Sequence, residues 1–506
     1  MKVNNLKFLL LFLLLTFLSL IPNLLFSQVD TAWVRRYDGE NDLDWATAIF
    51  VDNNGNVYVT GCSCDTLTDL DYTTLKYDSN GNLLWERRYN GPGNGEDVPY
   101  VLFVDNQGNV YVTGRSDGSG TYYDYATLKY DANGNLLWER RYNGPENSWD
   151  CATSLFVDNY GNVYVTGFSF SSGTYEDYVT LKYDVNGNLL WERRYNGPGN
   201  GYDEANALFV DNYGNVYVTG FSYGSGTWYD YATLKYDANG NLLWERRYDT
   251  PRNGDDGATS LFVDNFGNVY VTGYSLGSGT YYDYATLKYD GNGNLLWERR
   301  YNGLGNDKDY AASLFVDNFG NVYVTGYSLG SGTSFDYATL KYDADGNLLW
   351  ERRYNGVEND SDYATSLFVD NDGNVYVTGF SKGSGTYYDY ATLKYDANGN
   401  LLWEIRYNGS GNWYDSPTAL FVDNDGNVYV TGGSYGSNTY FDYATIKYIQ
   451  RPSISEEKEN KIEKKLAKKG DKIYDISGKL VKEKKLKKGI YFKETEKEMK
   501  KILILK

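Results

Sequence analysis

Carboxylates are the most regularly spaced residues of this sequence that could take part in chemistry. One set of aspartates recurs every 53 residues: Asp44, Asp97, Asp150, Asp203, Asp256, Asp309, Asp362 and Asp415. A catalytic group is needed once, whereas this group is present in every copy of a repeat. We therefore expect these aspartates to accept backbone N–H bonds in the loops that they end. A calcium or sugar site built from a few of them is the alternative.

Two acidic turns have the alternating oxygen ligands of a calcium-binding loop. One contains Asp343 and Asp345, and the other contains Asp370 and Asp372. Both lack the bidentate glutamate that ends an EF-hand loop, and the equivalent turns often carry Asn, Ala, Tyr or Phe at these places. The pattern therefore favours hairpin turns. Calcium stays open as a cofactor, and we predict no other.

The sequence contains no histidine and three cysteines, Cys62, Cys64 and Cys151. The lack of histidine excludes Ser–His and Cys–His nucleophile pairs and histidine-ligated metals. An odd number of cysteines allows at most one disulfide. Because the other repeats lack cysteine, we interpret the three as isolated substitutions rather than as a redox site. These observations predict a protein that is not an enzyme, with a hydrolase or lyase using Asp, Glu or Tyr as the alternative.

Aromatic side chains in the variable loops are the candidate ligand contacts. They are Trp149, Tyr202, Trp228, Trp413 and Tyr414. Exposed aromatic rings supply contact area at a low cost in conformational entropy. Packing within the loops is the alternative interpretation of the same residues.

These residues belong to a repeat that occurs eight times. Its tryptophans are 53 residues apart, except for a first step of 52: Trp33, Trp85, Trp138, Trp191, Trp244, Trp297, Trp350 and Trp403. One copy predicts four strands, at 152–158, 162–166, 177–183 and 189–195, rich in β-branched and aromatic residues. Two of the links are tight turns with glycine. The other two are loops of about ten residues, and they fall together on the opposite face, where we expect function.

Four antiparallel strands in a repeat of this length predict a propeller blade. The array begins with a lone fourth strand, 32–37, and ends with three strands, the last at 442–448. If the first strand completes the last blade, no sheet edge of an open array stays exposed. We therefore predict an all-β, eight-bladed propeller over 28–450, closed in this way and followed by a small β-rich tail.

The repeat resembles two known kinds of propeller. The run V-D-N-x-G-N-V-Y-V-T-G, followed by D-Y-A-T-L-K-Y-D-x-N-G-N-L-L-W, resembles the SBBP family of bacterial β-propeller repeats over 32–448. That resemblance implies a propeller outside the cytoplasm and no particular activity. Asp131 to Gly134 followed by Trp138 is similar to the tryptophan-docking motif of PQQ-like quinoprotein dehydrogenases and outer-membrane assembly propellers. This second resemblance implies that each of the eight tryptophans packs between adjacent blades.

The two ends of the chain predict export. Residues 1–27 have a basic start and an apolar run, typical of a secretory signal peptide, with a membrane anchor as the alternative. Residues 451–470 are a charged linker. Residues 471–506 resemble the type A C-terminal sorting domain of the type IX secretion system, which implies a contact with that secretion machinery and a secreted or cell-surface location.

The formal net charge of the whole chain is −19, although residues 451–506 hold 19 Lys or Arg against 10 Asp or Glu. The repeats are therefore strongly acidic, which excludes nucleic acid as a partner. We predict a monomeric, exported, non-enzymatic binding scaffold for an extracellular glycan or protein, without a transmembrane helix in the mature chain. A periplasmic scaffold for protein assembly is the alternative.

Overall fold

The structure is a computed structural model that describes residues 28–39, 43–64, 69–250 and 252–451, and strands at 472–475, 480–481, 489–494 and 499–504. The expected signal peptide and nearly all of the charged linker lie outside these residues. The chain divides into two compact units, one of residues 29–449 and one of residues 1–28 with 450–506. Each is described here by itself.

The larger unit consists of eight four-stranded antiparallel sheets, the blades. The first and second strands of blades 1 to 8 are β2 (Asp44–Val51) and β3 (Val57–Cys64), β6 (Asp97–Val104) and β7 (Val110–Asp117), β10 (Asp150–Val157) and β11 (Val163–Ser171), β14 (Asp203–Val210) and β15 (Val216–Tyr223), β18 (Asp256–Val263) and β19 (Val269–Leu276), β22 (Asp309–Val316) and β23 (Val322–Leu329), β26 (Asp362–Val369) and β27 (Val375–Lys382), and β30 (Asp415–Val422) and β31 (Val428–Tyr435).

The third and fourth strands follow in the same blade order. They are β4 (Leu70–Tyr77) and β5 (Leu83–Tyr89), β8 (Tyr123–Tyr130) and β9 (Leu136–Tyr142), β12 (Tyr175–Tyr183) and β13 (Leu189–Tyr195), β16 (Tyr229–Tyr236) and β17 (Leu242–Tyr248), β20 (Tyr282–Tyr289) and β21 (Leu295–Tyr301), β24 (Phe335–Tyr342) and β25 (Leu348–Tyr354), β28 (Tyr388–Tyr395) and β29 (Leu401–Tyr407), and β32 (Phe441–Arg451) with β1 (Gln28–Tyr37).

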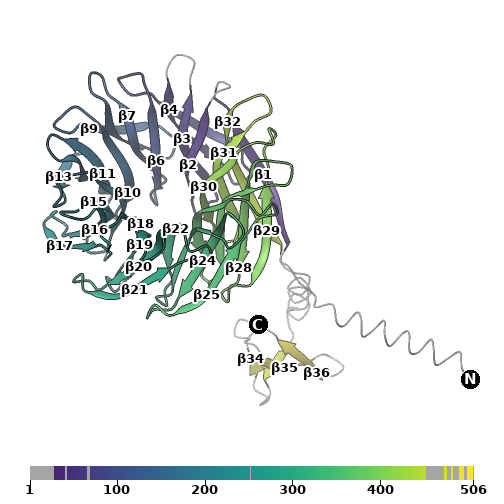
Figure 1. The fold of residues 1–506 in the computed structure, drawn as a ribbon. Helices are drawn as coiled ribbons and strands as arrows, with labels where there is room; N and C mark the ends of the chain where they lie inside the picture. The colour runs from purple at the N-terminus through teal and green to yellow at the C-terminus, as the bar shows by residue number, and fades with distance from the viewer. Residues whose placement is uncertain are drawn as a thin grey trace, which may run out of the picture. The chain divides into compact units, whose positions relative to one another are not determined.

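The ring closes as the sequence predicted. Blade 8 has the order β1-β32-β31-β30, so the first strand of the array completes the last blade. In Figure 1 the purple β1 lies beside the yellow-green β32. The guanidinium of Arg36 in β1 forms an ion pair with Asp442 in β32 at 2.5 Å. The predicted fold, an eight-bladed propeller with this closure, is confirmed.

The first strand of each blade lies innermost, as a ring of phenylalanines shows. Successive ring centroids are 5.4–6.3 Å apart and the series returns to its start. The members are Phe50, Phe103, Phe156, Phe209, Phe262, Phe315, Phe368 and Phe421. One apolar position of the repeat therefore builds a continuous collar around the propeller axis.

The loops are shorter than the sequence predicted. The second strand runs on past the T-G pair, and in blade 2 Asp117 pairs with Tyr123 of the third strand. Only 118–122 remain between these strands, and 143–149 separate blade 2 from blade 3. The expected length of about ten residues was wrong because residues read as loop are paired across the strands.

The eight repeat tryptophans lie between neighbouring blades, with 4–9% of each side chain exposed. The indole Nε1 of Trp85 in blade 1 donates to the carbonyl of Ala132 in blade 2 at 3.2 Å. Its ring contacts Tyr58 of its own blade and Tyr130 of the next, with centroids 6.3 and 6.5 Å apart. One apolar cluster thus spans two blades at each junction.

The C-terminal unit contains a four-stranded sheet in the order β34-β33-β35-β36. Its strands are β33 (Lys472–Asp475), β34 (Leu480–Val481), β35 (Gly489–Glu494) and β36 (Met499–Ile504). The expected β-rich tail is present in these strands. A search of the described residues finds no helix with the length and apolar character needed to cross a membrane.

Candidate functional site

The propeller has two faces of different construction. The turns between first and second strands and between third and fourth strands lie on one face, called here the turn face. The links between second and third strands and between blades lie on the other, the loop face. This arrangement follows from the antiparallel order of every blade.

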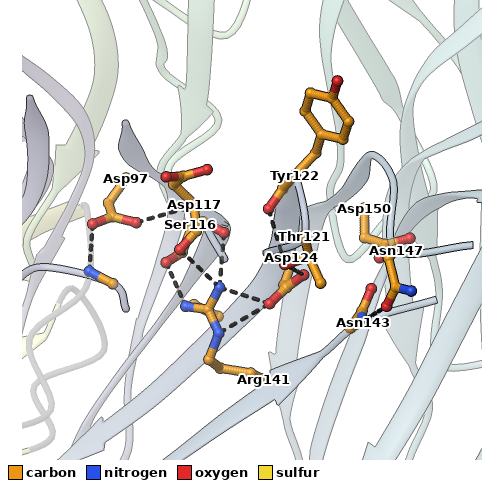
Figure 2. Close-up of polar contacts among 12 residues, drawn as sticks. Asp97, Ser116, Asp117, Thr121, Tyr122, Asp124, Arg141, Asn143, Asn147 and Asp150 are labelled. Carbon is orange, nitrogen blue, oxygen red and sulfur yellow. Dashed lines mark hydrogen bonds and ion pairs between the residues drawn. The ribbon is translucent and has the colours of Figure 1, made fainter. Parts of the chain in front are cut away.

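The recurrent aspartates hold the loops of the loop face. In blade 2, Asp97 Oδ2 accepts the backbone N–H of Gly91 at 2.5 Å, and Oδ1 accepts that of Asp117 at 3.0 Å (Figure 2). Burial raises the pKa of Asp97 to about 6. The same type of bond is formed at Asp150 with Gly144. These aspartates are therefore used as loop supports, which is the interpretation that the sequence favoured.

An arginine that the sequence analysis did not single out fastens each blade below these loops. Figure 2 shows Arg141 between Ser116 and Asp124. Its guanidinium forms an ion pair with Asp124 at 2.7 Å and donates to the Ser116 hydroxyl and to Tyr89 of the previous blade. Tyr89 in turn donates to Glu139 at 2.7 Å. The base of the loop face is thus the same rigid network in blade after blade.

The turn face uses its aspartates as turn caps. Asp343 Oδ1 accepts the backbone N–H groups of Asp345 and Asn347, and Asp370 accepts those of Asp372 and Asn374. The same bonds form at Asp158, where the third turn residue is a tyrosine. The four calcium candidates therefore lie in turns whose geometry does not depend on a second acidic residue.

The repeats differ at four positions of the loop face, which together we call the loop-face rim. The residues before the recurrent aspartates are Leu43, Glu96, Trp149, Tyr202, Asp255, Lys308, Ser361 and Tyr414, and those after them are Trp45, Val98, Cys151, Glu204, Gly257, Tyr310, Tyr363 and Ser416. The residues after the T-G pair are Cys62, Arg115, Phe168, Phe221, Tyr274, Tyr327, Phe380 and Gly433, and those before the D-Y pair are Leu70, Tyr123, Glu176, Tyr229, Tyr282, Phe335, Tyr388 and Phe441.

One half of this rim is an aromatic arc. Consecutive ring centroids are 4.8–5.8 Å apart along the series Tyr274, Tyr310, Tyr327, Tyr363, Phe380 and Tyr414. Phe441 continues the arc from Tyr414 to Trp45, at 6.0 and 5.0 Å. The arc therefore runs from blade 5 through blade 8 to blade 1.

The other half of the rim carries charge. Arg115 and Glu96 form an ion pair at 3.0 Å in blade 2. The carboxyl groups of Glu176 and Glu204 interact between blades 3 and 4, and burial, reinforced by Glu176, raises the pKa of Glu204. Sequence reasoning missed this pair. Aligning the eight copies would have shown both glutamates as departures at positions that are aromatic or apolar in most blades.

The five predicted ligand contacts do not all lie together in the structure. Trp149, Tyr202, Trp228 and Trp413 are exposed, at 47%, 42%, 61% and 54%. Trp413 stacks on Tyr387 at 4.9 Å and Tyr414 lies within the aromatic arc. The other three lie in loops of blades 2 to 4, each against a different tyrosine. They do not form one cluster with Trp413 and Tyr414 in the ring contacts of the described residues.

Two further features carry no reactive chemistry. Burial raises the pKa of the Cys62 and Cys151 thiols to about 12, so neither is an activated nucleophile. A cavity of about 790 Å³ lies on the turn face beside Phe50 and Phe421. Its lining consists largely of the aspartate–asparagine turns that every blade repeats, so we assign no ligand to it.

Comparison with known proteins places this propeller in a family. The sequence model of the outer membrane protein assembly factor BamB matches residues 76–335, more than half of the chain. The chain belongs to this family. The model of the SBBP beta-propeller repeat also matches, at residues 32–63 and 352–385. Both resemblances stated for the repeats are thereby supported. No curated protein shows significant sequence similarity to the chain.

Solved structures with a similar fold are distant in sequence. The WD40 domain of SCAP from fission yeast is 11% identical, covers 83% of this chain and 98% of its own, and has a TM-score of 0.43. The polysaccharide lyase PL25 ulvan lyase is 10% identical, with 81% and 95% covered and a TM-score of 0.43. Drosophila Plexin A in complex with Semaphorin 1b is 9% identical, with 91% and 95% covered and a TM-score of 0.42. These likenesses carry no argument about function.

Proposed function

We propose that the protein is an exported, non-enzymatic scaffold that binds an extracellular glycan or protein at its loop-face rim. The observation that carries the proposal is the contrast within one chain of near-identical blades. The networks of Asp97 and Arg141 recur around the ring, whereas the four rim positions vary among the blades. Selection for stability alone would leave the rim as uniform as these networks.

The composition of the rim supports binding rather than catalysis. Its aromatic arc offers partly exposed rings and hydroxyl groups, which suit a protein or sugar surface. The recurrent carboxylates are used within the fold, as at Asp97 and Asp124. A hydrolase or lyase is the second candidate, and the pair Glu176 and Glu204 is the observation that favours it, because paired carboxyls can exchange a proton.

The family match supports a third candidate. Because the matching model describes an outer membrane protein assembly factor, a periplasmic assembly scaffold is the alternative to a surface or secreted location. The apolar start of residues 1–27 and the tail after residue 470 support export in either case. The location of the protein in its cells therefore decides between these two scaffolds.

The test compares matched aromatic variants on the two faces. The rim variant combines Tyr363→Ala and Tyr414→Ala, at two rim positions, with Trp413→Ala beside them. The control combines Tyr160→Ala, Tyr213→Ala and Phe266→Ala, whose side chains are 84–87% exposed on the turn face. The immobilised propeller is offered a glycan array and the secreted and outer-membrane proteins of its native cells.

We expect the rim variant to lose at least about ten-fold in capture while its melting temperature stays close to that of the wild type. The turn-face control should bind as the wild type does. If the control loses capture and the rim variant keeps it, the ligand docks on the turn face and the proposal is wrong.

A further inference from the structure

Blade 2 contains a cation-binding arrangement made of its own residues. The hydroxyl of Tyr123 donates to Glu96 Oε2 at 2.9 Å. The guanidinium of Arg115 forms an ion pair with the same Oε2 at 3.0 Å and lies over the Tyr123 ring, 4.6 Å from its centroid. An acid and a tyrosine at the rim thus hold a guanidinium by charge and by its contact with an aromatic face.

Blade 5 repeats this arrangement without the cation. Asp255 and Tyr282 stand at the positions of Glu96 and Tyr123, and the Tyr282 hydroxyl donates to Asp255 Oδ2 at 3.1 Å. Tyr274 replaces Arg115. The other oxygen of the carboxylate, Asp255 Oδ1, is buried and has no hydrogen-bond partner among the described residues.

The Tyr274 ring lies against Tyr282, with their centroids 5.3 Å apart, and a cavity opens beside these two rings. It has a volume of about 540 Å³ and is lined by four tyrosines and three small residues: Tyr274, Tyr282, Tyr310, Tyr327, Thr259, Ala311 and Ala312. This volume lies within the range of ligand-binding pockets, roughly 300–1,000 Å³. The cavity lies between blades 5 and 6, at one end of the aromatic arc.

A single small residue helps to create this space. In most blades the position of Ala312 holds a threonine or asparagine that bonds across to the next blade. Thr259 Oγ1, for example, donates to the Ala311 carbonyl at 2.8 Å. Ala312 has no such group, so the junction between blades 6 and 7 lacks this bridge and the pocket gains room.

The charge around the cavity favours a cation. Burial, with Tyr282, Asp255 and Asp307 as further causes, raises the pKa of Tyr310 to about 12. The tyrosines are therefore neutral at physiological pH and present their electron-rich faces to the pocket. Burial, with Asp255 as a further cause, also raises the pKa of Tyr274. The Asp255 carboxylate places negative charge near this ring, which disfavours an anionic ligand.

We propose that this tyrosine pocket binds the guanidinium group of an arginine side chain on a protein ligand, through its tyrosine rings and with the carboxylate of Asp255 held behind Tyr282. The inference rests on the proposed function, since it names a contact made at the same rim. Arginine fits better than lysine because a planar guanidinium stacks on aromatic rings and is more weakly hydrated. Of the two classes of ligand in the proposed function, protein and glycan, this inference assigns protein.

The test uses short peptides with the full propeller. An acetylated Gly-Gly-Arg-Gly-Gly amide is compared with the same peptide carrying citrulline, which keeps the shape of arginine but has no charge, and with N-acetyl-arginine amide. Binding is followed by NMR titration. A contact of this kind is worth about 0.5–2 kcal/mol, so we expect the citrulline peptide to bind roughly 3- to 30-fold more weakly. Equal binding of the arginine and citrulline peptides, or no binding of the arginine peptide, overturns the proposal.

Three variants test whether the arginine peptide binds in this pocket. Tyr282→Ala should abolish the preference for arginine over citrulline, whereas Tyr281→Ala, an exposed neighbour outside the lining, should keep it. Tyr274→Arg recreates the arrangement of blade 2, so it should raise the melting temperature and block the peptide. Peptide binding that survives Tyr274→Arg contradicts the inference.

The remaining outcomes distinguish a protein ligand from a small molecule, and failure of this inference from failure of the proposed function. If N-acetyl-arginine amide binds about ten-fold more tightly than the peptide, the pocket takes a small molecule and the assignment to a protein ligand is wrong. If Tyr363→Ala with Trp413→Ala and Tyr414→Ala loses capture while no arginine probe binds, this inference fails and the proposed function stands.

Discussion

Replacing one repeat tryptophan tests how the blades are held together. Trp85 is 9% exposed, and its indole donates to the Ala132 carbonyl of the next blade at 3.2 Å. Truncating a buried tryptophan to alanine costs about 3–5 kcal/mol, of which the hydrogen bond contributes about 1 kcal/mol. The Ala132 carbonyl keeps a second donor, Lys76 Nζ, at 3.1 Å. Trp85→Phe, which retains an aromatic ring, should therefore cost only about 1–2 kcal/mol.

The assay is thermal unfolding followed by circular dichroism and calorimetry. For a unit of this size we expect Trp85→Ala to lower the melting temperature by roughly 3–6 °C. Trp149→Ala is the matched control, because its ring is 47% exposed and lies in a loop, and it should shift the melting temperature by less than about 2 °C. Equal shifts for the two alanine variants would refute the assignment of Trp85 to the junction between blades.

Four further predictions follow from the same contacts. Burial raises the pKa of Asp97 to about 6, so the folded state binds the proton of this carboxyl more tightly than the unfolded state does. The resulting gain in stability is complete below about pH 4 and is lost as the pH rises through 6. Asp97→Asn should therefore make the melting temperature depend less on pH between pH 4 and 8. Glu204→Gln should raise the melting temperature at pH 9 more than at pH 5, since burial and Glu176 raise the pKa of Glu204 and its charged form is disfavoured in the folded state. Adding calcium should leave the melting temperature unchanged within about 1 °C, because Asp343 already caps its own turn. In fractionated native cells, mass spectrometry should find the protein at the surface or in the medium without the tail from about Lys472, whereas an intact tail in the periplasm would favour the assembly scaffold.

The fold could be predicted from the sequence because every signal repeats. The glycine turns, the tryptophan spacing and the unpaired strands at the two ends of the array determine the blade, the ring and its closure by β1 and β32. Loop length was misjudged, since residues such as Asp117 and Tyr123 extend the strands although they stand among turn-forming neighbours. The alternation of apolar and polar residues along a strand does not show at which residue the pairing with the next strand ends.

The rim was less predictable, because it depends on residues that meet across blades. Trp413 and Tyr414 were expected at a ligand site, but Phe380, the neighbour of Tyr414 in the aromatic arc, was not among the predicted contacts. Glu176 and Glu204 come from different blades, and nothing in their spacing shows that their carboxyl groups approach each other. Comparing equivalent positions of the eight copies is the sequence signal that would have exposed these differences.

The most direct test of the account is photo-crosslinking in native cells from a probe on each face. A photoreactive phenylalanine replaces Tyr281 on the loop face or Phe266 on the turn face, two aromatic residues that are 58% and 87% exposed in the same blade. The account predicts specific cross-linked products from position 281 and none from position 266. Products from position 266 alone would show that the ligand is held on the turn face, contrary to the proposed function.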